Sequence, residues 1–75
     1  MSRIAFRRIA PDESRIYEDG DHVGDVYAQD DILHPGRRVF VIHLDEDPRG
    51  PVRVRDRDRI RDVAQQQVDS HPLWG

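Results

Sequence analysis

The sequence predicts an α+β domain, with a small antiparallel sheet of three to four strands and one C-terminal helix packed on one face. Two observations predict this class. Short segments rich in β-branched and aromatic residues are separated by turn-forming residues, as is typical of antiparallel sheets. Near the C-terminus, the apolar spacing changes to that of a helix. A chain of 75 residues has room for one domain, which we expect to span 1–75.

The first strands are expected where apolar residues alternate between turn signals. One strand is predicted over 3–9, and residues 16–17 could add a short strand after it. The Asp19-Gly20 pair predicts a tight turn. A further strand follows over 22–28, where Gly24 indicates a bulge or a close approach of two backbones.

The clearest strand is predicted over 38–44. Residues 39–42 are all apolar, as is Leu44, so both faces of this strand carry apolar side chains. A strand of this kind belongs inside a sheet rather than at its edge. A short alternating strand over 52–55 follows a turn.

The last element is predicted to be a helix. Five residues form one apolar stripe at helical spacing: Ile60, Val63, Ala64, Gln67 and Val68. Asp56 or Asp58 can cap its start, and Pro72 limits its end. We expect Leu73 and Trp74 to fold back and cover a thin core, since burial of an indole is strongly stabilising. The alternative is that they form a hook for a partner.

This order, four strands followed by one helix, resembles that of AP2-type and integrase arm-type DNA-binding domains. The resemblance lies in the order of elements, and no residue motif accompanies it.

Several classes are excluded by what the chain lacks. With no Cys it can form neither disulfides nor a cysteine-based zinc site. It has no apolar run of about 18 residues, and no apolar segment follows its first residues. We therefore expect no transmembrane helix, no signal peptide and a cytoplasmic location.

The basic residues are unusual in kind. All 12 are Arg, and the chain has no Lys, Asn or Thr. Arg, Asp, Val, Gly and Pro have GC-rich codons, so we interpret the composition as that of a GC-rich bacterial or phage genome. The abundance of Arg is therefore not by itself a sign of anion binding.

Charge is distributed unevenly along the chain. Residues 12–31 hold eight acidic residues and one Arg, whereas 49–61 hold six Arg and two Asp. The arginines expected to bind a partner are Arg53, Arg55, Arg57, Arg59 and Arg61. The acidic candidates are Asp19, Asp21 and Asp25. A net charge of −3 disfavours general binding to phosphate backbones, so a protein partner fits this two-signed surface better.

Each charged segment also has a purely structural interpretation. The arginines could form an exposed face paired with local carboxylates, such as Asp58 with Arg61 and Arg59 with Asp62. Alternation over 52–55 directs its two arginines outward, where we expect them to contribute little to the stability of the fold. The acidic segment could be a solvated face, or could imitate nucleic-acid charge and block a partner.

One string resembles a metal-binding loop. When residues 19–30 are aligned with the twelve-residue calcium loop of an EF-hand or dockerin, Asp stands at positions one and three, Gly at six, Val at eight and Asp at twelve. The string departs from that pattern at Val23, where an oxygen ligand is needed, and at Asp30, where Glu is usual. Pro11 and Pro35 leave little room for two flanking helices. We therefore predict a plain hairpin here, with no metal and no cofactor.

The sequence does not indicate catalysis. The four histidines show no metal-ligand spacing. His43 shares a strand face with Val41 and is expected to be partly buried and hydrogen-bonded, whereas His34 and His71 precede prolines and are expected in loops. Ser70 beside His71 does not form a dyad, because sequence neighbours rarely align for proton transfer.

We therefore expect a non-catalytic binding module, a small regulatory or inhibitory protein of bacterial, phage or mobile-element origin that acts by protein–protein contact. The alternative is a nucleic-acid-binding domain that uses the Arg-rich strand and helix start. A homodimer is also left open, and no membrane partner is expected. Salt-sensitive retention on DNA or RNA would distinguish the alternative from the main expectation.

Overall fold

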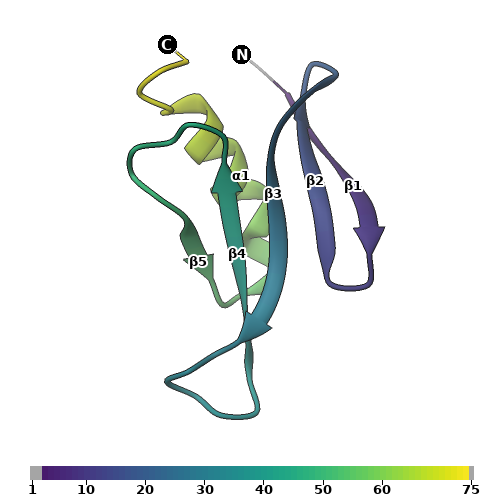
Figure 1. The fold of residues 1–75 in the computed structure, drawn as a ribbon, viewed down its shortest axis with the longest axis vertical. Helices are drawn as coiled ribbons and strands as arrows, with labels where there is room; N and C mark the ends of the chain where they lie inside the picture. The colour runs from purple at the N-terminus through teal and green to yellow at the C-terminus, as the bar shows by residue number, and fades with distance from the viewer. Residues whose placement is uncertain (1–2, 75) are drawn as a thin grey trace.

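A five-stranded antiparallel sheet with one helix against it forms the computed structural model, which describes residues 3–74 (Figure 1). The strands are β1 (Ile4–Ala10), β2 (Glu13–Glu18), β3 (Asp21–Asp30), β4 (Arg38–Leu44) and β5 (Val52–Val54). They lie side by side in chain order. A 3₁₀ turn, η1 (Arg57–Arg59), leads into helix α1 (Ile60–Asp69). The α+β class and the C-terminal helix are confirmed, but the expected three to four strands are five.

The additional strand is β2. Its sequence has two Glu, one Ser and one Arg, so it lacks the apolar alternation that marks a strand. Pairing on both sides makes it a full strand, because β1 and β3 both form ladders with it. Its central Ile16 is fully buried. Long-range pairing, rather than local propensity, determines this element.

The Asp19-Gly20 turn joins β2 to β3 as predicted. Both residues have positive φ, 50° for Asp19 and 91° for Gly20. This geometry gives a two-residue hairpin whose twist matches that of its strands. The calcium-like string 19–30 consequently forms a turn and a continuous strand, instead of a loop between two helices.

Gly24 marks a close approach of backbones, as its position in β3 predicted. A Cβ at this residue would collide with the His43 carbonyl oxygen on β4 and lie 2.9 Å from Leu44 Cδ2. The register also shifts on the other side of β3, between Ile16 and Tyr17. A side chain at this position would push β4 away from β3.

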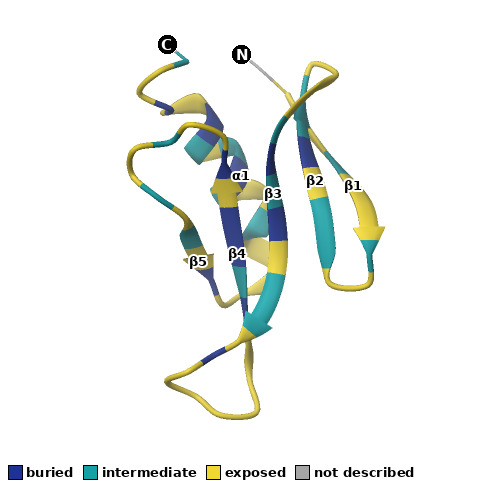
Figure 2. Cartoon of the chain, in the orientation of Figure 1, coloured by how far each residue is buried: buried dark blue, intermediate teal, exposed yellow. Residues whose placement is uncertain are grey.

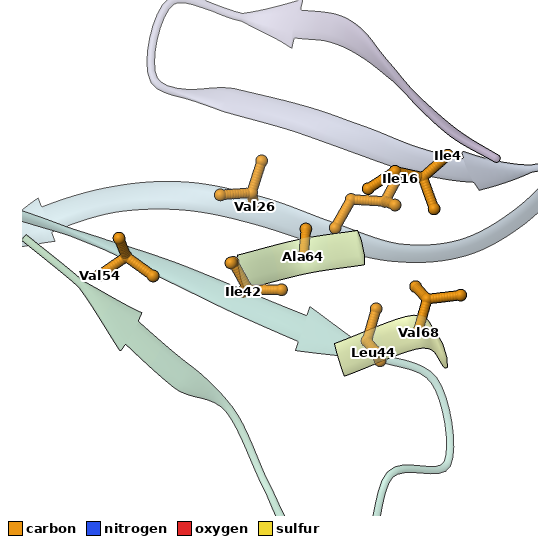
Figure 3. Close-up of a cluster of buried hydrophobic side chains, with 8 residues drawn as sticks. All are labelled: Ile4, Ile16, Val26, Ile42, Leu44, Val54, Ala64 and Val68. Atoms are coloured by element: carbon orange, nitrogen blue, oxygen red, sulfur yellow. The ribbon is translucent and has the colours of Figure 1, made fainter. Parts of the chain in front are cut away.

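The core lies between α1 and one face of the sheet (Figure 2). Eight buried residues form it: Ile4, Ile16, Val26, Ile42, Leu44, Val54, Ala64 and Val68. Figure 3 shows the sheet side chains of this cluster around Ala64 and Val68, which come from the helix. The predicted helical stripe is confirmed at these two positions, and Ile60 and Val63 pack against the same cluster.

Within residues 3–74, no helix covers the opposite face of the sheet, which we call the open face. Val39 and Val41 are nevertheless buried there, as expected for a strand with two apolar faces. Val41 is paired with Tyr27 on one side and Arg53 on the other, and paired residues share a face of an antiparallel sheet. These two long side chains flank Val41. The prediction for His43 is wrong, because this residue is exposed on the open face.

The C-terminal segment folds back on the core. Trp74 packs against the buried cluster, which confirms the prediction for the indole. The prediction for Leu73 is wrong, because its side chain is 63% exposed. His71 lies in the loop after α1 as expected, but it is buried. Its Nε2 donates to the Asp45 carbonyl at 3.0 Å, which joins the end of the helix to the end of β4.

Candidate binding surfaces

The five candidate arginines do not form one surface. Arg53 and Arg55 line a hollow on the open face, which we call the loop hollow. Arg57 and Arg61 line a second hollow on the helix side, which we call the arginine hollow. Arg59, in η1, is exposed and lines neither hollow. An unbroken run in sequence is therefore divided between two faces, because the chain passes around the lower edge of the sheet to begin the helix (Figure 1).

The arginine hollow combines cations with an apolar floor. It has a volume of about 490 Å³. Four arginines from four elements line it: Arg8, Arg38, Arg57 and Arg61. The apolar residues that line it include Phe6, Val26, Phe40 and Ile60. Its acidic residues are Asp12 and Glu13. Its Arg8 and Arg38 were not among the candidates, because 30 positions separate them in sequence.

The short helix accounts for this hollow. Helix α1 has 10 residues, as does strand β3. A helix of that length is about 15 Å long, whereas such a strand spans about 33 Å. The helix covers the upper part of the sheet and leaves the lower part uncovered (Figure 1). Phe6, Phe40 and Ile60 are only half-buried as a result.

Three of the four arginines in the arginine hollow, Arg8, Arg57 and Arg61, form no ion pair among the described residues. Arg8 donates from Nη2 to the Pro11 carbonyl at 3.0 Å, and this neutral partner holds it in place. The Arg61 guanidinium lies 5.0 Å from the centroid of the Phe6 ring, which is a cation–π contact. Arg38 alone is paired, with Nη1 2.7 Å from an Asp12 carboxylate oxygen, and this pairing raises its pKa.

The loop hollow is organised around a buried carboxylate. Asp31 is 7% exposed, and its two oxygens have different partners. One accepts the Leu33 backbone N–H at 3.0 Å, and the other accepts Arg55 Nε at 3.1 Å. Burial raises the pKa of Asp31, but these hydrogen bonds outweigh it and lower the pKa overall. The ion pair thus fixes the β3–β4 loop to the chain that follows β5.

That loop displays two large apolar side chains to solvent. Ile32 is 88% exposed and Leu33 is 75% exposed. Both line the loop hollow, which has a volume of about 520 Å³ and also borders Val39 and Arg53. This feature could have been found in the sequence, because Ile32 and Leu33 are an apolar pair within a segment of turn-forming residues. Arg55 points outward as expected, with its side chain 61% exposed, and it also pairs with Asp31 of this loop.

The acidic candidates lie away from these hollows. Asp19 and Asp21 are exposed at the β2–β3 turn, at the upper end of the sheet (Figure 2). Asp25 is on the open face, where one carboxylate oxygen lies 3.1 Å from His22 Nε2. Strand pairing therefore disperses the acidic segment over both ends of the sheet, and no single acidic face results.

Arg49 serves the helix rather than a surface. Its Nη2 donates to the Gln67 carbonyl at 2.9 Å, and its Nη1 donates to Ser70 Oγ at 2.8 Å. These bonds occupy acceptors in the last turn of α1, where a cation is also favourable. Asp47 holds the same guanidinium through Nη2 at 2.8 Å. Hydrogen bonds from Arg49 lower the pKa of Asp47 to about 2.

The expected pairs within the helix start do not form. Among residues 3–74, the ion pairs join His22 to Asp25, Arg38 to Asp12, Arg49 to Asp47 and Arg55 to Asp31. The pairs Asp58–Arg61 and Arg59–Asp62 are not among them. Asp56 instead caps η1, with its carboxylate accepting the Asp58 N–H at 3.0 Å. Asp56 thus caps the 3₁₀ turn that leads into the helix, whereas α1 itself follows Arg59 and has no side-chain cap.

Searches for similarity give no family. No known protein family, curated protein or solved structure matches this chain. Within the described residues, no three His, Asp or Glu side chains are grouped so that they could hold a metal ion. The part of the chain that the structure describes also has no helix with the length and apolar character needed to cross a bilayer.

Proposed function

We propose that the chain is a non-catalytic protein-binding module, a small regulatory or inhibitory protein whose partner docks on the β3–β4 loop. The observation that carries this proposal is the anchored apolar pair. One Asp31 oxygen accepts the Leu33 N–H within the loop and the other pairs with Arg55, so the segment that bears the exposed Ile32 and Leu33 is tied to the chain after β5. An anchored loop loses little conformational entropy on binding.

The energetics favour a protein partner at this loop. Burial of one large apolar side chain contributes about 1.5–3 kcal/mol, so the pair Ile32–Leu33 offers a small hot spot. Arg53 and Arg55 border the same hollow and supply a polar rim. Apolar side chains exposed in this way do not assist binding to a phosphate backbone.

Nucleic-acid binding has weaker support. A duplex or single strand needs a continuous basic track. The candidate arginines lie on two faces of the sheet, and the chain carries a net charge of −3. Arg55 is also engaged by Asp31.

The test compares three immobilised proteins in lysate of the source organism: the natural chain, the double variant Ile32→Ser/Leu33→Ser, and the control Leu73→Ser. Leu73 is similarly exposed, but it belongs to the segment after α1, which lies at the opposite end of the molecule from the β3–β4 loop (Figure 1). Quantitative mass spectrometry should find proteins that the natural chain and the control retain and the double variant loses. Equal retention by all three proteins would contradict the proposal.

Two further measurements separate the alternatives. Sedimentation of the natural chain reports self-association, and a dimer that the double variant abolishes would identify a second copy as the partner at this loop. Salt-sensitive retention on DNA, unchanged in the double variant, would instead favour the nucleic-acid alternative. A thermal melt of each variant checks that the fold is intact.

A further inference from the structure

We propose that the arginine hollow is a second binding site, which takes a short acidic peptide segment of a partner protein. One apolar or aromatic side chain of the segment would lie on the floor, and neighbouring carboxylates would bind the arginines. This site is on the helix side of the sheet and shares no described lining residue with the loop hollow, so the inference goes beyond the function proposed above.

The floor of the hollow calls for an apolar group. Phe6 and Phe40 of the sheet, and Ile60 at the first position of the ten-residue helix, pack at the edge of the core, where the helix covers the sheet only in part. They are therefore left half-buried. A volume of about 490 Å³ accommodates one large side chain together with the backbone beside it. Burial of that side chain would complete the apolar layer that the helix leaves open.

The rim of the hollow calls for anions. Its lining has four arginines and two acidic residues, in a chain whose total charge is −3. Neutral groups, a backbone carbonyl and an aromatic ring, position Arg8 and Arg61, so their charge is available to a ligand. Arg57 is exposed and takes part in no ion pair among the described residues. Guanidinium groups held in this way bind carboxylates through paired hydrogen bonds.

A peptide fits better than a nucleic acid. Asp12 and Glu13 belong to the lining itself, and Asp58 and Asp62 alternate with the arginines of η1 and α1. A long polyanion would extend past the hollow and meet these carboxylates, whereas a short segment can place its own charges on the arginines alone. The half-exposed aromatic and aliphatic floor also matches an apolar anchor residue.

The probe is a synthetic seven-residue peptide with a central Phe and three Glu on each side. We expect saturable shifts of amide signals in ¹⁵N spectra, confined to the elements that line the hollow: β1, the β1–β2 turn and start of β2, the part of β3 around Val26, the start of β4, η1 and the first turn of α1. A peptide with Lys in place of Glu, and one with Ser in place of Phe, should each bind at least about tenfold more weakly. Loss of affinity with either change would show that both charge and the apolar anchor are needed.

Two variants with the same change in net charge make the test specific. Arg57→Glu reverses a charge in the hollow, whereas Arg7→Glu reverses an exposed charge on the open face of β1. Arg57→Glu should lower the affinity for the peptide about tenfold, and Arg7→Glu should have little effect on that affinity. An equal loss of affinity in both variants would show that the peptide is bound by nonspecific charge attraction, and would overturn the proposal.

Other outcomes would also overturn it. Absence of saturable shifts at peptide concentrations up to about 1 mM would mean that the hollow has no useful affinity for the probe. Tighter binding of a thymidine oligonucleotide at the same residues, sensitive to Arg57→Glu, would assign the hollow to nucleic acid. Thermal melts of both variants should match that of the natural chain, because both arginines are exposed and outside the core.

Discussion

The imidazole of His71 lies parallel to the indole of Trp74, with ring centroids 3.6 Å apart and an angle of 10° between the planes. The Trp74 backbone N–H also donates to the His71 carbonyl at 3.2 Å. This stack closes the end of the core where α1 stops. It explains how a chain of 75 residues brings its lone Trp onto the core after the helix has ended.

Replacement of Trp74 by Ala should lower the free energy of unfolding by about 2 kcal/mol. The loss is smaller than the ~3–5 kcal/mol typical of a fully buried Trp, because Trp74 is half-buried. Urea unfolding followed by circular dichroism measures the change. Leu73→Ala is the matched control and should have little effect, since Leu73 is exposed. An emission maximum of Trp74 equal to that of free tryptophan would contradict this placement.

The imidazole of His71 should carry its hydrogen on Nε2 in the folded protein. The Leu73 backbone N–H donates to Nδ1 at 3.1 Å, so Nδ1 must carry a lone pair. The Asp45 carbonyl can only accept, so the hydrogen lies on Nε2. Long-range ¹H–¹⁵N correlation spectra distinguish the two tautomers directly. A hydrogen on Nδ1 would be inconsistent with the loop geometry after α1.

Asp47 should contribute a stability that is lost in acid. Its pKa in the folded protein is about 2, below its ordinary value of 3.8, because Arg49 donates hydrogen bonds to its carboxylate. As the pH falls, the unfolded chain binds the proton first, so the contribution is complete above about pH 5 and vanishes toward pH 2. The difference in melting temperature between the natural chain and Asp47→Asn should shrink over this range. Asp21→Asn, at an exposed turn, serves as the control.

Gly24→Ala should destabilise the sheet by about 2 kcal/mol or more, through a clash with β4. The new Cβ would meet the His43 carbonyl oxygen and Leu44 Cδ2, and a backbone atom cannot move aside without shifting a strand. Gly20→Ala is an informative comparison, because its space is open and its cost comes from the positive φ alone. Chemical denaturation of both variants measures the difference. A Gly24 variant as stable as the natural chain would mean that β3 and β4 separate easily.

Loss of the Arg55 guanidinium should loosen the β3–β4 loop. Arg55→Gln removes the ion pair to Asp31, whose other oxygen accepts the Leu33 N–H. Hydrogen exchange of the Leu33 amide should then become faster, while exchange in the core strands stays unchanged. Arg53→Gln is the control, because Arg53 takes part in no ion pair among residues 3–74. Equal exchange rates in the two variants would show that Asp31 holds the loop without Arg55.

The strongest local patterns determined several elements by themselves. The apolar residues of 38–44 predicted β4 with its bounds, since a strand with two apolar faces has no stable place outside a sheet. The stripe from Ile60 to Val68 predicted α1 for the same reason of burial. Asp19-Gly20 predicted the hairpin, because few residue pairs adopt two successive positive φ angles.

Contacts between distant residues decided the rest. Pairing with β1 and β3 made a strand of the polar segment Glu13–Glu18. The sequence determined that 49–61 is rich in arginine, but only the tertiary structure assigned Arg49 to the helix end and Arg55 to Asp31. It also brought Arg8 and Arg61 into one hollow. Local sequence sets the propensity and the burial pattern of a segment, whereas the partner of a charged side chain depends on which chain segments the fold brings within hydrogen-bonding distance.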